Sequence, residues 1–93
     1  MREATARRLR IRAWRRGTKE MDLILGPYAD AHLDGMDAEG LARFEALMEE
    51  NDQDLYQWVS GALPAPQEHA ALIGRISRHA LGRLTGSDGA HRI

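Results

Sequence analysis

Histidine, serine and glycine residues are all present in this chain, but their spacing does not assemble a catalytic site. None of the four histidines pairs at the i, i+4 spacing that places two imidazoles on one helical face for a metal ion. No serine lies in a strand–turn–helix elbow, and the nine glycines form no GxGxxG or GxxxxGK[ST] phosphate loop. The sequence therefore predicts a protein that is not an enzyme, with no catalytic, metal-binding or cofactor-binding residues. We expect His32 to be a partly buried residue at a helix end.

The acidic residues near the middle of the chain resemble a calcium loop only superficially. Glu49, Glu50, Asp52 and Asp54 lie close together, but the twelve-residue spacing, the central glycine and the closing bidentate glutamate are missing. Helix capping explains these acids better, and Asp52 is our candidate for the residue that caps a short helix.

The stretch Arg16-Gly17-Thr18-Lys19-Glu20 stands where the chain should pass from one helix into the next. Gly17 fits two geometries: it closes the first helix in the left-handed conformation, or it lies in the first turn of the second helix and lets another backbone approach. Thr18 or a neighbour then caps the second helix. If the chain is helical here, Arg16 and Glu20 lie one turn apart on the same face. Spacing alone fits a turn glycine with an exposed ion pair as well as a docking surface.

Charge is distributed unevenly along the 93 residues. Residues 1–19 carry seven arginines and one lysine against Glu3, residues 20–60 carry eleven acids against Arg43, and the net charge is only −1. We therefore expect a dipolar molecule with a basic N-terminal helix and an acidic middle. The arginines occupy all sides of that helix, so a helix that lies against an acidic neighbour in the same molecule is at least as good an interpretation as a nucleic-acid reader.

Apolar residues recur at helical spacing almost throughout, which predicts an all-α fold, a compact bundle of about five short helices. The spacing places Leu9, Ala13 and Trp14 on the inward side of the first helix, and Leu41, Phe44, Leu47 and Met48 on that of the third. The first covers 2–15 and the second 18–33, with a kink or restart at Pro27. The third follows an N-cap at Asp37, the fourth ends at Gly61, and the fifth runs from Pro66 to about Gly82. Residues 1–85 form one domain in this interpretation, and residues 86–93 form a flexible tail.

At two blocks the sequence resembles a known family, the small assembly factors of succinate dehydrogenase that are also called flavinylation factors. The first block is Arg-Gly-x-x-Glu, Arg16 to Glu20, followed by Met21-Asp22 and preceded by the aromatic Trp14. The second is FEALMEENDQDLYQW, residues 44–58, an acidic turn followed by Asp-Leu-aromatic-x-Trp. The two blocks occur in the family's order within a helical, cysteine-free chain of matching length.

The resemblance implies an all-helical protein that acts on another protein. Family members bind the flavoprotein subunit of succinate dehydrogenase, and often that of fumarate reductase, and promote covalent attachment of FAD to a histidine of that subunit. FAD would then be attached to the client, with none stably bound here. The partner-binding residues implied by position are Arg16, Gly17, Glu20, Asp22, Asp52, Asp54 and Tyr56.

The remaining expectations concern the chain's surroundings. The alternative function is a small nucleic-acid-binding or regulatory domain that uses the arginine-rich first helix. We expect a monomer that binds no nucleic acid. We also expect no insertion into a membrane, because no apolar run approaches the ~18 residues that a membrane span requires. A bacterial cytoplasmic location is expected, with the mitochondrial matrix as the alternative. The basic start is interpreted as a structural helix, with a targeting segment as the other possibility.

Overall fold

The computed structural model describes residues 2–85, with side chains from residue 3 to residue 82. Five α-helices follow one another, and the expected all-α fold is confirmed: no strand occurs among these residues. Their bounds are α1 Arg2–Trp14, α2 Lys19–His32, α3 Ala38–Met48, α4 Asp52–Val59 and α5 Gln67–Thr85, with a 3-10 turn, η1 Leu33–Gly35, after α2. The tail expected at residues 86–93 lies outside the described residues.

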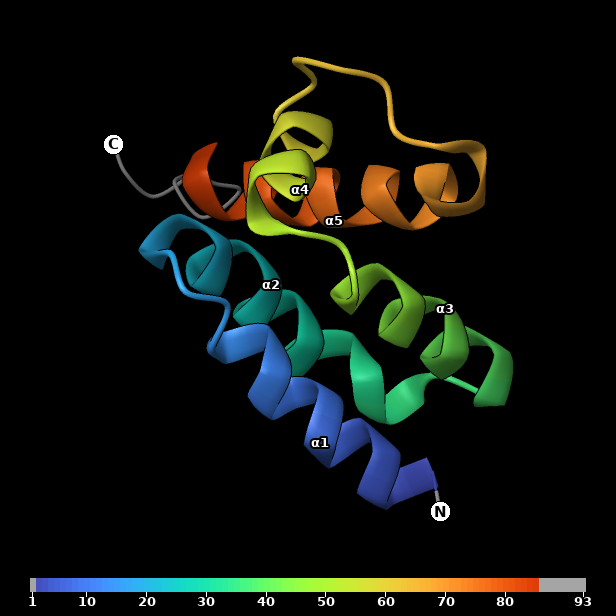
Figure 1. Cartoon of the computed structure of the whole chain (residues 1–93). Coiled ribbons are helices and arrows are strands. Elements are labelled where there is room, and N and C mark those ends of the chain that lie inside the picture. Colours follow the sequence, from blue (N-terminus) through green and yellow to red (C-terminus); the bar gives the residue numbers. More distant parts are fainter. Residues whose placement is uncertain (1, 86–93) are drawn as a thin grey trace.

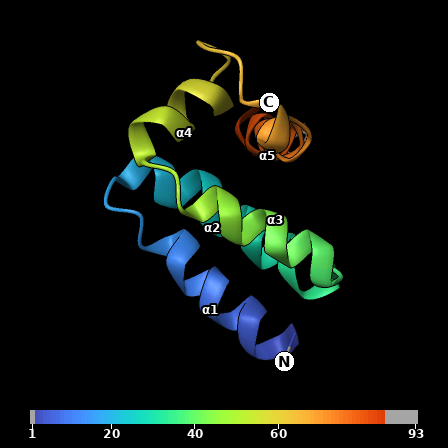
Figure 2. The same cartoon turned by 45° about the vertical axis from the view of Figure 1, so that its right-hand side comes forward.

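The helices form two groups that cross each other. Helices α1, α2 and α3 lie side by side and alternate in direction, and α5 runs across them (Figure 1). When α1, α2 and α3 lie across the view, α5 is seen nearly end-on (Figure 2). Helix α4 lies beside the start of α2 and against α5, so the acidic turn before it comes close to the connection between α1 and α2.

The helical periodicity of the sequence identified the core. The predicted inward residues of α3, Leu41, Phe44, Leu47 and Met48, are all buried. Leu55, Val59 and the α5 residues Leu72, Ile73 and Ile76 are buried as well. One expectation is wrong: His32 does end α2, but it is exposed, at the point where the chain turns into η1. Its ring is tilted against that of Tyr28 at a centroid distance of 4.5 Å.

Two of the three N-caps expected from the sequence are confirmed, and the third is formed by the neighbouring residue. The hydroxyl of Thr18 accepts a hydrogen bond from the Met21 amide, and the carboxylate of Asp37 accepts one from the Gly40 amide, as expected. Asp52 does not cap α4. Asn51 does, because its side chain accepts from the Asp54 amide, and this leaves the Asp52 carboxylate available for another contact.

Helix α2 continues through Pro27 from Lys19 to His32, so of the kink or restart expected at this proline the restart is wrong, and the kink stays a prediction. Proline removes one backbone donor. Buried residues on both sides, Leu25 before it and Tyr28 after it, are packed in the core and hold both halves in one helix.

A tryptophan packed on a glycine joins α1 to α2. A Cβ atom added at Gly26 would overlap the indole ring of Trp14, so the ring lies directly on the bare backbone of α2. The indole N–H then donates to the Asp30 carboxylate at 3.2 Å. Trp14 was expected to face inward, but it is 38% exposed. It covers the contact between α1 and α2 from outside and is not a core residue.

Several arginines of the basic N-terminal helix form ion pairs with acidic residues from the middle of the chain. Arg8 pairs with Glu45 of α3, Arg10 with Asp34 of η1, and Arg12 with Glu49 beyond the end of α3, at 3.0–3.1 Å. The interpretation of α1 as a charged helix lying against an acidic neighbour is therefore confirmed. Within residues 2–85 no helix is both long enough and apolar enough to span a membrane.

Candidate protein-docking site

Gly17 lies in the connection between α1 and α2 and has a φ angle of +111°. This left-handed region favours glycine because other residues carry a Cβ atom that crowds the backbone there. The residue is exposed, and an added Cβ would meet only the Asp52 Oδ2 atom, at 3.7 Å. Of the two geometries left open by the sequence, the first turn of α2 is wrong, because α2 begins at Lys19. The positive φ is confirmed, but in the connection, three residues after α1 ends.

The neighbouring Arg16 has the opposite environment, since its side chain is only 10% exposed. Its Nε atom lies 2.8 Å from Asp52 Oδ1. Its two terminal nitrogens donate to backbone carbonyl oxygens, Nη1 to Met48 at 2.7 Å and Nη2 to Glu50 at 2.6 Å. A cation at the last carbonyls of α3 is also favoured by the helix dipole. One guanidinium thus joins the α1–α2 connection to the end of α3 and the start of α4.

The backbone of the connection is held from the α2 side. The Arg16 amide donates to Asp22 Oδ1 at 2.6 Å, and Asp22 is half-buried. The i, i+4 pair of Arg16 with Glu20 does not form, because the chain is not helical at residues 15–18 and Arg16 is turned toward Asp52. Arg16, Asp22 and Asp52 therefore form a network, called here the Arg16 network. It lies on the inner side of the connection, whereas Gly17 is on the outer, exposed side.

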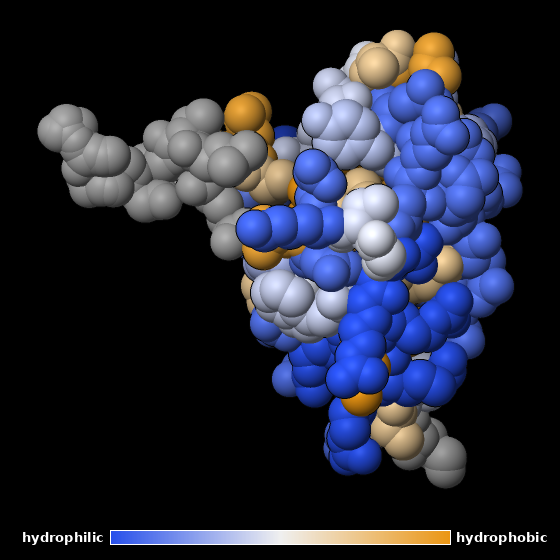
Figure 3. All heavy atoms as spheres, turned by 60° about the vertical axis from the view of Figure 1, so that its left-hand side comes forward, coloured by the Kyte–Doolittle hydropathy of each residue, from blue (hydrophilic) through white to orange (hydrophobic). Residues whose placement is uncertain are grey.

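Two exposed side chains line a hollow beside Thr18, the residue that follows Gly17. Glu20 is exposed in the first turn of α2, and Tyr56 of α4 is 49% exposed. Together with Thr18 and Met21 they line a hollow of about 290 Å³. Gly17, Glu20 and Tyr56 are called here the Gly17 surface. The view that brings the side of the α1–α2 connection forward shows mostly hydrophilic side chains, with paler ones of intermediate hydropathy among them (Figure 3).

Six of the seven residues proposed from the sequence fall into two groups of three. The Gly17 surface faces solvent, and the Arg16 network lies beneath it. Asp54 belongs to neither: it is half-buried at the start of α4, where Asn51 Nδ2 donates to its Oδ2 at 3.0 Å. Whether any of the seven contacts a partner stays a prediction.

Two features of this region could not be read from sequence spacing. A groove of about 320 Å³ adjoins Tyr56 and is lined by α2, α4 and α5, at Ile24, Tyr56, Val59, Ser60, Ser77, Ala80 and Leu81. His69, only 4% exposed, places its Nε2 atom 3.0 Å from Glu50 Oε2 and so joins α5 to the turn held by Arg16.

Among the described residues, Glu50, Glu68 and His69 form a group that could hold a metal ion, with one ligand atom each within 4.8 Å of one another. Glu50 and His69 already contact each other there, so their role in the fold is to join the α3–α4 turn to α5. They are 19 residues apart, which is why no local motif revealed them.

Comparison with known proteins gives a consistent result. The family model described as "Flavinator of succinate dehydrogenase" matches residues 7–80, which include all of the residues of the Gly17 surface and the Arg16 network. The chain is 43% identical over 72 residues to the FAD assembly factor SdhE of Acetobacter pasteurianus, covering 77% of this chain and 66% of that protein.

Mitochondrial relatives are similar over comparable lengths. Identity is 34% over 76 residues to succinate dehydrogenase assembly factor 2-A of Drosophila yakuba, and 36% over 75 residues to assembly factor 2 of Cryptococcus neoformans. These matches cover 80% and 78% of this chain but only 47% and 43% of the two relatives, so the chain spans about half of their length. The family model covers most of the chain, including the Arg-Gly-x-x-Glu motif, and the relatives carry the same kind of name. The chain therefore belongs to the family of flavinators of succinate dehydrogenase.

Proposed function

We propose that this protein is an assembly factor that binds the flavoprotein subunit of succinate dehydrogenase and promotes covalent attachment of FAD to it. The observation that carries the proposal is the Gly17 surface: an exposed backbone turn in the left-handed conformation, held from beneath by a buried arginine. The names of the relatives, a FAD assembly factor and succinate dehydrogenase assembly factors, support the client and the reaction.

The proposed contact uses the missing side chain of Gly17. Without a Cβ atom, a partner backbone can approach the turn closely. Glu20 offers a carboxylate and Tyr56 a half-exposed ring beside it, and aromatic residues are common anchors of protein interfaces. Arg16 and Asp52 take part indirectly, because they fix the turn rather than reach the partner.

The factor contributes positioning to the reaction and no reacting group. The bond between histidine and flavin forms by the chemistry of the cofactor itself. Binding that favours the client conformation with histidine and flavin in attack geometry raises the rate without a catalytic residue. In this proposal the factor is not an enzyme, acts as a monomer, holds no FAD stably and works in a bacterial cytoplasm; fumarate reductase is a second client of the same kind.

Reconstitution tests this function directly. The purified apo flavoprotein subunit is incubated with FAD, with and without this protein, and the denatured subunit is examined for covalent flavin fluorescence. We expect the protein to increase the rate of covalent attachment and to co-purify with the apo subunit. Equal rates with and without it, under conditions where the subunit is folded, would rule the function out.

A further inference from the structure

A second concave surface lies between α2, η1, α3 and α5, and it shares no residue with the Gly17 surface. It has a volume of about 660 Å³ and is called here the basic cleft. Its lining residues are Tyr28, Ala31, His32, Gly35, Met36, Gly40, Arg43, Leu72, Arg75, Arg78 and His79. Three arginines and two histidines contribute to this lining and no carboxylate does, in a chain whose net charge is −1.

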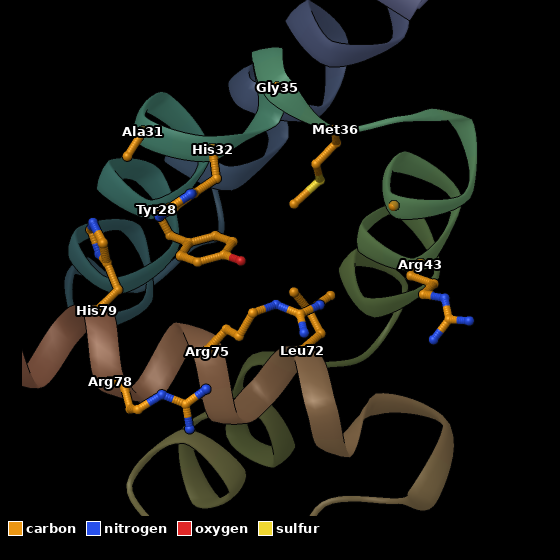
Figure 4. Close-up of a pocket in the computed structure, with 11 residues that line it drawn as sticks. Tyr28, Ala31, His32, Gly35, Met36, Arg43, Leu72, Arg75, Arg78 and His79 are labelled. Atoms are coloured by element: carbon orange, nitrogen blue, oxygen red, sulfur yellow. The ribbon is translucent and has the colours of Figure 1, made fainter.

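The side chains of the cleft are arranged around a buried tyrosine. Tyr28 is 2% exposed, and its ring packs against His32 and His79 at centroid distances of 4.5 and 5.5 Å. Arg75 points into the cleft below Tyr28 and alongside Leu72, whereas Arg43 lies on the opposite wall (Figure 4). Met36 also points inward, so the floor is apolar and the rim is cationic (Figure 4).

The α5 arginines of the cleft differ from the α1 arginines that hold the fold together. Arg8, Arg10 and Arg12 each pair with a carboxylate of another element. Arg43 pairs with Glu39 one turn away. Among the described residues no carboxylate lies within ion-pair distance of Arg75 or Arg78, and both are exposed. They are therefore available to an external anion.

The exposure of the rim decides what kind of anion fits. One exposed guanidinium–carboxylate pair changes an affinity by only about twofold to fivefold. Several carboxylates on one chain add their contributions, because each contact after the first forms at high effective concentration. We propose that the basic cleft binds an acidic segment of a protein partner, with carboxylates at Arg75 and Arg78 and an apolar side chain against Leu72 and Met36. This site is independent of the Gly17 surface and of the function proposed for it.

Titration with a peptide of six glutamates around one central leucine, followed by backbone amide NMR of the full chain, tests the proposal. We expect shifts concentrated at the cleft residues of α5, η1 and the start of α3. Arg75→Glu should weaken the affinity by about tenfold, because it replaces an attraction with a repulsion. Arg7→Glu, the same change at an exposed position of α1, should alter it by less than about twofold. Arg78→Glu is the second cleft variant should Arg75→Glu fail to fold.

Four results would overturn the proposal. Equal weakening by Arg7→Glu means that only overall charge matters. Inorganic phosphate that binds in the cleft as tightly as the peptide means a small-anion site. Single-stranded DNA that outcompetes the peptide there means a nucleic-acid surface. Self-association that is lost in Arg75→Glu means that a second copy of this chain occupies the cleft.

Discussion

Arg16 and Gly17 are neighbours in the chain, yet the side chain of the first is 10% exposed and the second faces solvent. The arginine contacts residues 48, 50 and 52, whereas a Cβ atom at the glycine would meet only Asp52 among the described residues. The motif therefore combines two roles: the arginine fixes the turn, and the turn presents the glycine. Asp52 shares the role of the arginine, because it binds the guanidinium that fixes the turn. Glu20 shares the exposure of the glycine.

Arg16→Ala should destabilise the fold strongly. It leaves the Asp52 carboxylate and two backbone carbonyl oxygens, at the end of α3 and in the turn after it, without their partner. The loss of one member of a buried pair costs about 3–5 kcal/mol. For a domain of this size each kcal/mol lowers the melting temperature by about 4–8 °C. The matched control is Arg8→Ala, whose pair with Glu45 is exposed and contributes at most about 1 kcal/mol. An Arg16→Ala protein that melts like the wild type but no longer binds the client would make Arg16 a contact residue instead.

Glu20→Ala should have the opposite profile. The side chain is exposed, and its favourable position in the first turn of α2 accounts for only about 0.3–1 kcal/mol of stability. We expect a melting temperature within a few degrees of the wild type and a clearly weaker affinity for the client subunit, measured by calorimetry. Glu39→Ala, in the first turn of α3, is the control with a similar helix position away from the Gly17 surface. Unchanged affinity in Glu20→Ala would remove Glu20 from the docking surface.

At the scale of helices, the packing of α1 on α2 depends on Gly26. Gly26→Ala puts a methyl group into the indole ring of Trp14, and overpacking of this kind costs about 1–3 kcal/mol. Gly82→Ala, within α5, meets no atom of the described residues within 4 Å outside its own helix turn. It should be neutral or stabilising by up to about 1 kcal/mol, because alanine is the better helix former. Chemical denaturation of both variants measures the difference. If the two are equally stable, Trp14 is not held against α2 in solution.

Helices and core were predictable because their signals are local. The spacing of Leu41, Phe44, Leu47 and Met48 identified the buried face of α3, and Thr18 and Asp37 were found as caps from residue type alone. Boundaries were within a few residues: α2 was expected over 18–33 and begins one residue later and ends one earlier.

The environment of the motif was not predictable, because it depends on residues far apart in the sequence. Arg16 and Asp52 are 36 residues apart, and only the packing of α4 beside α2 brings them together. The sequence interpretation therefore assigned Asp52 to a cap, and it placed Arg16 and Glu20 on one helix face only for the case that the chain is helical there. The groove at Tyr56 and the basic cleft each need at least three elements, so no single helical pattern reveals them.

At the scale of the whole molecule, the basic helix is largely neutralised from within. Three arginines of α1 and Arg16 all lie on carboxylates of the acidic middle of the chain. We therefore expect no submicromolar binding to random duplex DNA, because the release of counterions from DNA requires available cations. Fluorescence anisotropy at several salt concentrations measures this. Tight binding with a steep dependence on salt would favour the nucleic-acid alternative.

The Gly17 surface is tested most directly by a pair of glycine variants assayed for covalent flavin in the client. Gly61 has a φ of +86° and is exposed beyond the far end of α4, so Gly17→Arg and Gly61→Arg carry a similar backbone cost of about 1–2 kcal/mol. Both proteins are added to the apo flavoprotein subunit with FAD, and flavin fluorescence of the denatured subunit is followed over time. We predict that Gly17→Arg loses at least tenfold in rate, which is roughly the effect of losing one central interface contact. Gly61→Arg should keep a nearly normal rate. A folded Gly17→Arg protein that supports full flavin attachment would contradict the role of this surface.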